Sequence, residues 1–343
     1  MKNAEYKEIN MLLKISFICQ MVYMLYVFIV NIFRVPVLSI FRQEEIAGKV
    51  CVDIAYIAGV LIATVLMFVW YWILKDAIRK NKKLSIAHSV LLGLSVYVIY
   101  FKIPNVVYRL QFSYTFRQDY RSDAPYSIAS YAVDLFTIEQ YGMFLLAGAI
   151  LFLLSAYVIY WSKCKYEQEA TNKNRDSIAI NGLMFVSFVF QIFYLGQICL
   201  LNIFRVDYLS IYNEDEMVYF DIPFLIGAIL ITVFMVLWYR FIKEAIKQKK
   251  QIHFGHNLLL GISFLMFVYI VPVIANKIQV LLVENVFSMY ESGAVYGAKE
   301  NAVRLGAYET GEHFGLFVAF IFLTCAYVMY WTKMKYSQTQ NEV

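Results

Sequence analysis

Charged residues of both signs recur at matching places in the two halves of the chain. Each half has two cations and two anions at the ends of long uncharged segments. The eight residues are Arg34, Asp53, Arg109 and Glu139 in the first half and Arg205, Asp221, Lys277 and Glu312 in the second. Such a set could bind a zwitterion, a lipid headgroup or a partner. Because charge near hydrocarbon is costly unless it is paired, the balance of signs favours ion pairs that hold neighbouring helices together.

Four more polar side chains lie inside the uncharged segments. Gln20 and Gln191 lie near the middle of a segment, where an amide can hydrogen-bond between helices. His88 and His256 lie about one turn from the end of a segment, and we interpret them as hydrogen-bonded interfacial histidines. His253 shares a helical face with His256, but no carboxylate or cysteine completes a metal-ligand set. We therefore expect no metal and no cofactor.

The sequence lacks the usual signatures of catalysis and of ion-coupled transport. No Asp, Glu, Lys or Arg lies near the middle of an uncharged segment, where proton relays and coupled carriers usually need one. The motifs H-E-x-x-H, G-x-S-x-G, Walker A and G-x-G-x-x-G are absent. We therefore assign no catalytic residue and do not expect an enzyme.

Eight uncharged segments must position these side chains. The chain has 343 residues and is 61% hydrophobic, more than is usual for a soluble domain. Each segment has at least 18 residues, and about 20 helical residues cross a bilayer core. The sequence therefore predicts an all-α integral membrane protein. Its eight transmembrane helices are expected at Ile15–Phe33, Ile54–Leu74, Leu84–Phe101, Gln140–Ser162, Ser177–Phe204, Ile222–Tyr239, Gln251–Asn276 and His313–Thr332.

An internal repeat organises these segments. The string NIFRV occurs at 31–35 and again at 202–206, and matches continue through both halves, first 171 and then 168 residues apart. We interpret the chain as a tandem, parallel duplication of a four-helix unit. The first transmembrane repeat spans residues 1–168, a cytoplasmic linker 169–180 and the second repeat 181–343. An even number of helices per unit predicts a pseudo-two-fold axis along the membrane normal.

Two paired prolines interrupt the third and seventh expected helices. Pro104 and Pro272 lie at equivalent positions, and a proline inside a helix predicts a kink. Beyond the first of them we expect the helix to continue outward, followed by an amphipathic outer helix near Tyr126–Thr137.

The distribution of charge predicts the orientation. Of the 30 Lys and Arg residues, 19 lie in the two termini and the three alternate loops on the same side as the termini. Of the 25 acidic residues, 17 lie on the other side. The positive-inside rule therefore places both termini of a multi-pass cell (inner) membrane protein in the cytoplasm.

These observations restrict the expected function to the membrane and its two surfaces. We expect a binding, sensing or accessory component that acts through its outer segments and its basic cytoplasmic ends. A permease for a small uncharged or zwitterionic solute is the alternative, and an intramembrane enzyme is the third. The expected partners are anionic lipids at the cytoplasmic face and either a membrane protein or a second copy of the chain, with no nucleic acid.

Overall fold

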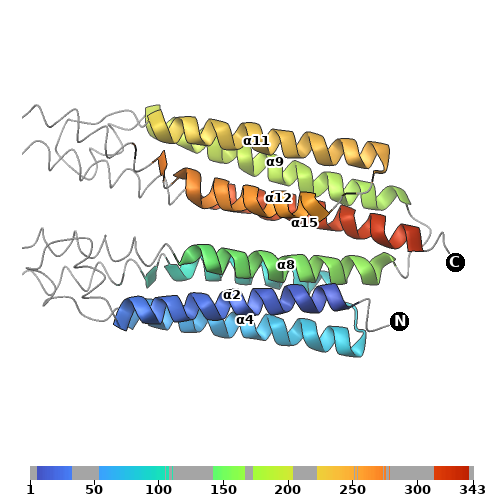
Figure 1. Ribbon diagram of the computed structural model, residues 1–343, viewed down its shortest axis with the longest axis horizontal. Helices are drawn as coiled ribbons and strands as arrows, with labels where there is room; N and C mark the ends of the chain where they lie inside the picture. Colours follow the sequence, from blue (N-terminus) through green and yellow to red (C-terminus); the bar gives the residue numbers. More distant parts are fainter. Residues whose placement is uncertain are drawn as a thin grey trace, which may run out of the picture. The chain divides into compact units, whose positions relative to one another are not determined.

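The structure is a computed structural model, and all of its regular structure in the described residues is helical (Figure 1). The described residues are 6–32, 54–104, 106–107, 110, 142–166, 173–203, 222–250, 252, 254–272, 274–275, 278 and 313–339. The chain divides into two compact units, unit 1 over Met1–Cys164 and unit 2 over Lys165–Val343.

Both units contain the same order of elements. Unit 1 has α2 (Lys7–Ile32), α4 (Ile54–Lys80), α5 (Ile86–Tyr97), the π-helical segment η2 (Val98–Lys102) and α8 (Met143–Tyr166). Unit 2 has α9 (Lys173–Ile203), α11 (Ile222–Gln248), α12 (Phe254–Leu265), the π-helical segment η3 (Met266–Ile270) and α15 (His313–Thr339). The start of α9 at Lys173 lies inside the segment 169–180 that was expected to be a linker.

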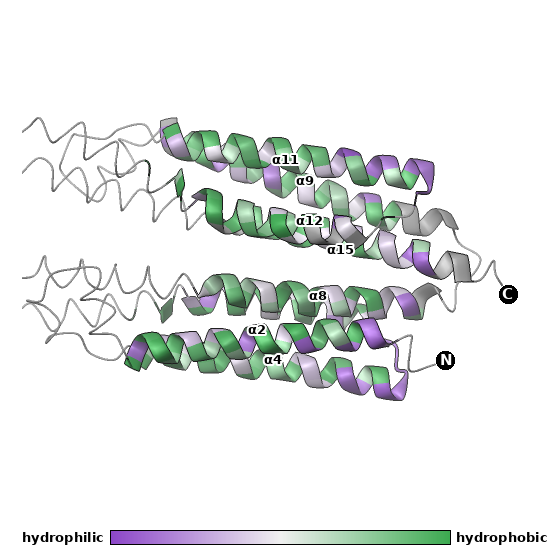
Figure 2. Ribbon diagram, viewed as in Figure 1, coloured by the Kyte–Doolittle hydropathy of each residue, from purple (hydrophilic) through white to green (hydrophobic). Residues whose placement is uncertain are grey.

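Six of these helices are long and apolar enough to cross a membrane. They are α2, α4, α8, α9, α11 and α15, and the mean hydropathy of their apolar parts ranges from 1.8 to 2.3. Figure 2 shows apolar residues along most of α4 and α11 and hydrophilic residues at one end of each. These helices suggest a multi-pass membrane protein. The third and seventh expected spans overlap shorter apolar helices, Ile86–Lys102 and Leu259–Val268.

Large aromatic side chains fill the interior of each unit. In unit 1 the Trp70 and Tyr157 rings meet edge to face with centroids 6.4 Å apart, and in unit 2 Trp238 and Tyr327 do so at 6.2 Å. Edge-to-face pairs contribute beyond the apolar area that they bury. The aromatic side chains that are almost completely buried include Tyr160, Tyr194, Tyr327, Phe224, Phe317 and Phe320.

The second helix of each unit ends in a left-handed residue. Asn81 has a φ of 51° and follows α4, and Lys249 has a φ of 52° and follows α11. The N–H of Lys82 donates to the Ala77 carbonyl at 3.0 Å, and that of Asn81 to the Ile78 carbonyl at 3.3 Å. This pair of bonds is the Schellman motif, which satisfies carbonyl groups left over at a helix end. The same two bonds close α11, at 3.1 and 3.3 Å.

A tyrosine from the last helix of each unit supports this turn. Tyr160 Oη on α8 lies 2.7 Å from the Ala77 carbonyl oxygen and 2.8 Å from that of Lys82. Tyr330 Oη on α15 lies 2.6 and 2.9 Å from the equivalent carbonyl oxygens of unit 2. Each hydroxyl therefore joins the last helix of its unit to the turn that follows the second helix.

A π turn directly precedes each of the two paired prolines. The Ile103 N–H donates to the Val98 carbonyl, five residues back, immediately before Pro104. Val271 makes the equivalent bond before Pro272. A proline ring clashes with the carbonyl four residues back in a regular α-helix. In each π turn the hydrogen bond reaches the carbonyl five residues back, so the helix is wider immediately before the proline. Helical geometry continues beyond the first proline, to Leu110 among the described residues.

Candidate functional site

Polar side chains on the first two helices of unit 1 face one another inside the bundle. Ser16, Gln20 and Tyr23 are buried on α2, and their spacing of four and three residues places them on one helical face. Each contacts a polar side chain of α4. We call this set the polar ladder: Ser16 with Tyr71, Gln20 with Thr64, and Tyr23 with Tyr56.

The first rung links three helices. Ser16 Oγ donates to the carbonyl oxygen of Ala149 on α8 and lies 2.8 Å from Tyr71 Oη on α4. A carbonyl oxygen can only accept, so the serine proton is used there and Tyr71 must be the donor to Ser16. The hydroxyl of one small residue therefore connects α2, α4 and α8.

The second rung leaves one buried polar atom without a partner in the part of the chain that the structure describes. Gln20 Nε2 donates to Thr64 Oγ1 at 2.8 Å, and Thr64 Oγ1 donates to the Val60 carbonyl at 2.7 Å. Gln20 is only 1% exposed. Its Oε1 accepts no hydrogen bond from any residue that the structure describes. Rotating the amide by 180° would let Thr64 donate to Oε1 but would leave Nε2 without that contact.

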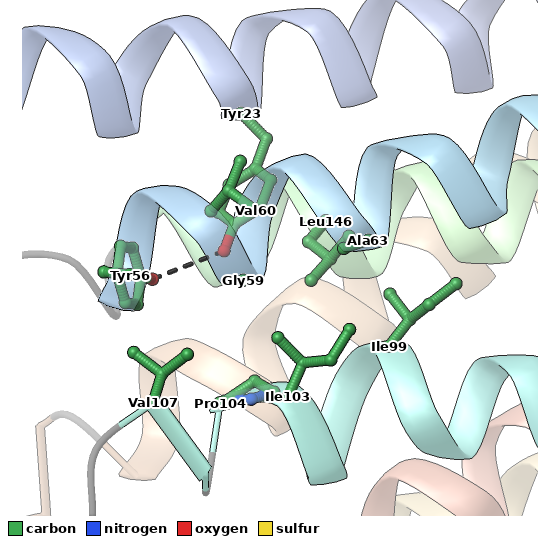
Figure 3. A pocket seen from close by; sticks show the side chains of 10 residues that line it. All are labelled: Tyr23, Tyr56, Gly59, Val60, Ala63, Ile99, Ile103, Pro104, Val107 and Leu146. Carbon is green, nitrogen blue, oxygen red and sulfur yellow. Dashed lines mark hydrogen bonds between the residues drawn. The ribbon is translucent and has the colours of Figure 1, made fainter. Parts of the chain in front are cut away.

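The third rung borders a small cavity (Figure 3). Tyr23 Oη and Tyr56 Oη are 3.3 Å apart, and Tyr23 also donates to the sulfur of Met143 at 3.5 Å. The cavity has a volume of about 10 Å³, near the lower limit for a single water molecule. Apart from the two tyrosines its walls are apolar: Gly59, Val60, Ala63, Ile99, Ile103, Pro104, Val107 and Leu146.

Gly59 allows the third helix to approach α4 beside this cavity. A Cβ atom at Gly59 would lie 2.7 Å from Val107 Cγ2 and 2.9 Å from Ile103 Cγ2. Gly227 has the same role in unit 2, where a Cβ would lie 3.0 Å from Val271 Cγ1. A side chain at Gly59 would therefore force its neighbours to shift, whereas at Gly227 the contact would be tight.

Unit 2 contains the first two rungs of the ladder. Ser187 Oγ lies 2.8 Å from Tyr239 Oη and donates to a carbonyl oxygen of α15. Gln191 Nε2 donates to Thr232 Oγ1 at 2.9 Å, and the Gln191 Oε1 also lacks a partner among the described residues. Gln191 is 0% exposed. Phe224 stands at the position that matches Tyr56, so the third rung has no equivalent hydroxyl pair.

The two histidines predicted from the sequence occupy different local environments. His88 Nδ1 lies 2.7 Å from the hydroxyl of Ser85, the residue that precedes α5. The His256 ring stacks on Phe241 with centroids 4.7 Å apart and planes inclined by 16°. Neither contact brings a histidine to the polar ladder.

Of the other predicted site residues, the structure describes the two glutamines but not the charged residues. It brings Gln20 and Gln191 into the ladders, whereas the eight outer charges from Arg34 to Glu312 all lie outside the described residues. Sequence reasoning did not single out the serine, threonine and tyrosine partners of the glutamines. A signal for them exists, because Ser16 and Ser187 are 171 residues apart and Thr64 and Thr232 are 168 apart, the two spacings of the repeat.

No protein-family model matches the sequence, and neither a curated protein nor a solved structure is significantly similar to it.

Proposed function

We propose that the protein is a binding, sensing or accessory component of a cell membrane that acts at its two aqueous surfaces and not through chemistry inside the membrane. The observation that carries the proposal is the polar ladder. Its side chains bond to one another and to backbone carbonyls, as Ser16 does with Tyr71 and Ala149. Polar groups that bond in this way hold helices together. We therefore assign the binding of partners to the ends of the helices.

We further propose eight membrane helices, formed by tandem duplication of a four-helix unit. The recurrence of the same side-chain bonds supports the duplication: the Ser16–Tyr71 contact matches Ser187–Tyr239, and both second helices end in a Schellman turn. Ile86–Lys102 supports a third span, because a helix of its length extends about 25 Å and helical geometry continues beyond it.

The excess of Lys and Arg supports an orientation with both termini in the cytoplasm. In this orientation the turns that follow α4 and α11 face the cytoplasm. The eight outer charges then lie on the opposite side, where they are available to staple helices or to contact a membrane protein or a second copy of the chain.

A permease for a small uncharged or zwitterionic solute is the second candidate. The observation that favours it is the pair of buried amide oxygens on Gln20 and Gln191, neither of which has a hydrogen-bond partner among the described residues. A buried carbonyl oxygen without a donor costs free energy, and a solute that carries N–H or O–H groups would relieve that cost.

Solute permeability separates the two candidates. Purified full-length protein would be reconstituted into liposomes, and swelling in glycerol, urea or glycine would be followed by stopped-flow light scattering. We expect the same rates as in protein-free liposomes, which set the baseline for each solute. A protein-dependent rate that Gln20→Met or Gln191→Met abolishes would replace the accessory function with transport. Ser95→Ala, which changes a serine of α5 outside the ladder, is the matched control.

A further inference from the structure

Exposed cations form a stripe at the end of α4. Trp72, Lys75 and Arg79 are three and four residues apart, so they share one face of the helix. Trp72 is 71% exposed, and both cations are exposed. Lys82 follows in the turn and is exposed as well. Unit 2 has Arg240, Lys243, Lys247 and Lys250 at the matching positions, and all four are exposed.

The stretches Lys75–Lys83 in unit 1 and Arg240–Lys250 in unit 2 each contain one acidic residue. In both, the residue four positions later contacts its carboxylate. Asp76 contacts Lys80 Nζ at 2.7 and 2.9 Å through its two carboxylate oxygens, and Arg79 lies farther from it, at 3.6 Å. In unit 2, Gln248 Nε2 donates to Glu244 Oε1 at 2.9 Å. Lys75–Lys83 and Arg240–Lys250 each contain five cations and one anion, a net charge of +4.

Part of the capping of each helix end does not involve the cations. Basic side chains near a helix C-terminus often bond its last carbonyl groups. Here the Schellman bonds already satisfy two of those carbonyls in each helix, and the hydroxyls of Tyr160 and Tyr330 contact one of the two as well. The exposed cations at the end of each helix are therefore available to bind an anionic group outside the protein.

We call the stretches Lys75–Lys83 and Arg240–Lys250 the basic turns. We propose that each basic turn binds the phosphate group of an anionic phospholipid from the surrounding bilayer. The cations that hold it are Lys75, Arg79 and Lys82 in unit 1 and Lys243, Lys247 and Lys250 in unit 2. This inference rests on the proposed membrane orientation and names the partner of its cytoplasmic face.

Two observations favour a lipid over a soluble anion, and a third suits its phosphate group. Each turn ends a helix whose apolar part has a mean hydropathy of 2.3, so it lies where headgroups begin. Trp72, on the same face as Lys75 and Arg79, is a residue that prefers the headgroup level. The charge of +4 complements an anionic headgroup, and an arginine can bind two phosphate oxygens at once.

Lipid binding to the purified full-length chain tests the proposal. Native mass spectrometry in detergent would count phosphatidylglycerol molecules bound per chain, with phosphatidylcholine as the neutral comparison. We expect two tightly bound phosphatidylglycerol molecules. The triple variant Lys75→Gln, Arg79→Gln and Lys82→Gln should bind one. Each removed cation should lower the affinity for the lipid about fivefold, so the three together should lower it about a hundredfold at the altered turn.

A charge-matched control separates a defined site from general attraction. The variant Lys80→Gln and Lys83→Gln removes two positive charges from the same turn and introduces the residues that unit 2 has there, Gln248 and Gln251. We expect it to keep both lipids. Equal losses in Lys80→Gln, Lys83→Gln and in the double variant Lys75→Gln, Arg79→Gln would overturn the assignment of particular cations.

Further outcomes also decide the proposal. Displacement of the lipid by millimolar inorganic phosphate would reassign the turns to a soluble anion. If a triple variant unfolds, the single variants Lys75→Gln and Lys243→Gln carry the test, each with an expected loss of about fivefold at one site. Solute flux together with two bound lipids would contradict the accessory function alone. Silent liposomes together with no preference for phosphatidylglycerol would contradict the lipid site alone.

Discussion

The second rung of the polar ladder allows the cost of an unpartnered buried atom to be measured. In Thr64→Val the isosteric side chain removes the acceptor of Gln20 Nε2, so the buried amide loses the contact that the structure gives it. A buried polar group without a partner costs about 1–3 kcal/mol. Hydrogen bonds between membrane helices average only about 0.6 kcal/mol. We expect Thr64→Val to lower the free energy of unfolding by about 1–2 kcal/mol.

Replacement of the glutamine should have the opposite sign. Gln20→Met removes the unpartnered Oε1 together with the bond to Thr64, and the Thr64 hydroxyl keeps the Val60 carbonyl as its acceptor. The lost bond is worth about 0.6 kcal/mol, and the removed oxygen about 1–3 kcal/mol. We therefore expect Gln20→Met to raise the free energy of unfolding by up to about 2 kcal/mol.

A double-mutant cycle combines the two changes. In the double variant no amide remains to be stranded, so Thr64→Val should cost almost nothing on the Gln20→Met background. The coupling energy should therefore equal most of the loss seen in Thr64→Val alone. Steric trapping in bicelles measures these free energies of unfolding. Gln191→Met and Thr232→Val in unit 2 provide a matched second cycle with the same expected signs.

Two results would refute this reasoning. If the two substitutions add without coupling, the Gln20–Thr64 bond does not hold the helices as described. If Gln20→Met lowers the free energy of unfolding by about 2 kcal/mol or more, the cost of losing a well-satisfied buried group, Oε1 has a donor in the membrane. The permease would then gain support.

Other positions give shorter tests. Lys249→Gly should raise the free energy of unfolding by about 0.5–1 kcal/mol, because the φ of 52° is unfavourable for a residue with a Cβ; a lower Tm in detergent would contradict this. Tyr160→Phe should cost about 1 kcal/mol through the lost hydroxyl contacts, and an unchanged Tm would show that the turn does not depend on them. In Lys80→Cys on a Cys51→Ser background, which removes the native thiol expected outside, the new thiol should react with an impermeant maleimide only after the cells are opened, and labelling of intact cells would reverse the topology. The sequence-based staple of Arg34 with Asp53 predicts that removing one charge destabilises more than removing both, and additive losses would disprove the pairing.

Much of the fold follows directly from the pattern of residues. The uncharged segment expected at Ile54–Leu74 lies within α4, and that at Ile222–Tyr239 lies within α11. These segments were predictable because in hydrocarbon a helix satisfies its own backbone groups, so the length of an apolar run is enough to identify it. The segment Leu84–Phe101 is less well defined by this rule, since the helix there passes into a π turn before Pro104.

The ends of the helices were less predictable. Hydrophobicity locates α4 and α11 but does not show that a left-handed residue follows each of them. These residues are Asn81 and Lys249, and lysine rarely takes this conformation. The conformation persists where the Schellman bonds and the hydroxyl from the last helix of the unit support it. That support comes from a residue about 80 positions away and has no local pattern.

The sequence by itself determined that this chain is helical and apolar, and it identified Gln20 and Gln191 as buried polar residues. Only the tertiary structure decided what those residues touch. The spacing of Ser16, Gln20 and Tyr23 shows that they share a face, but not that Thr64 receives the amide or that a carbonyl of α8 receives the serine proton. Helix formation depends on neighbours a few residues apart, whereas a rung joins residues 33 to 133 positions apart, and only the packing of whole helices brings such residues together.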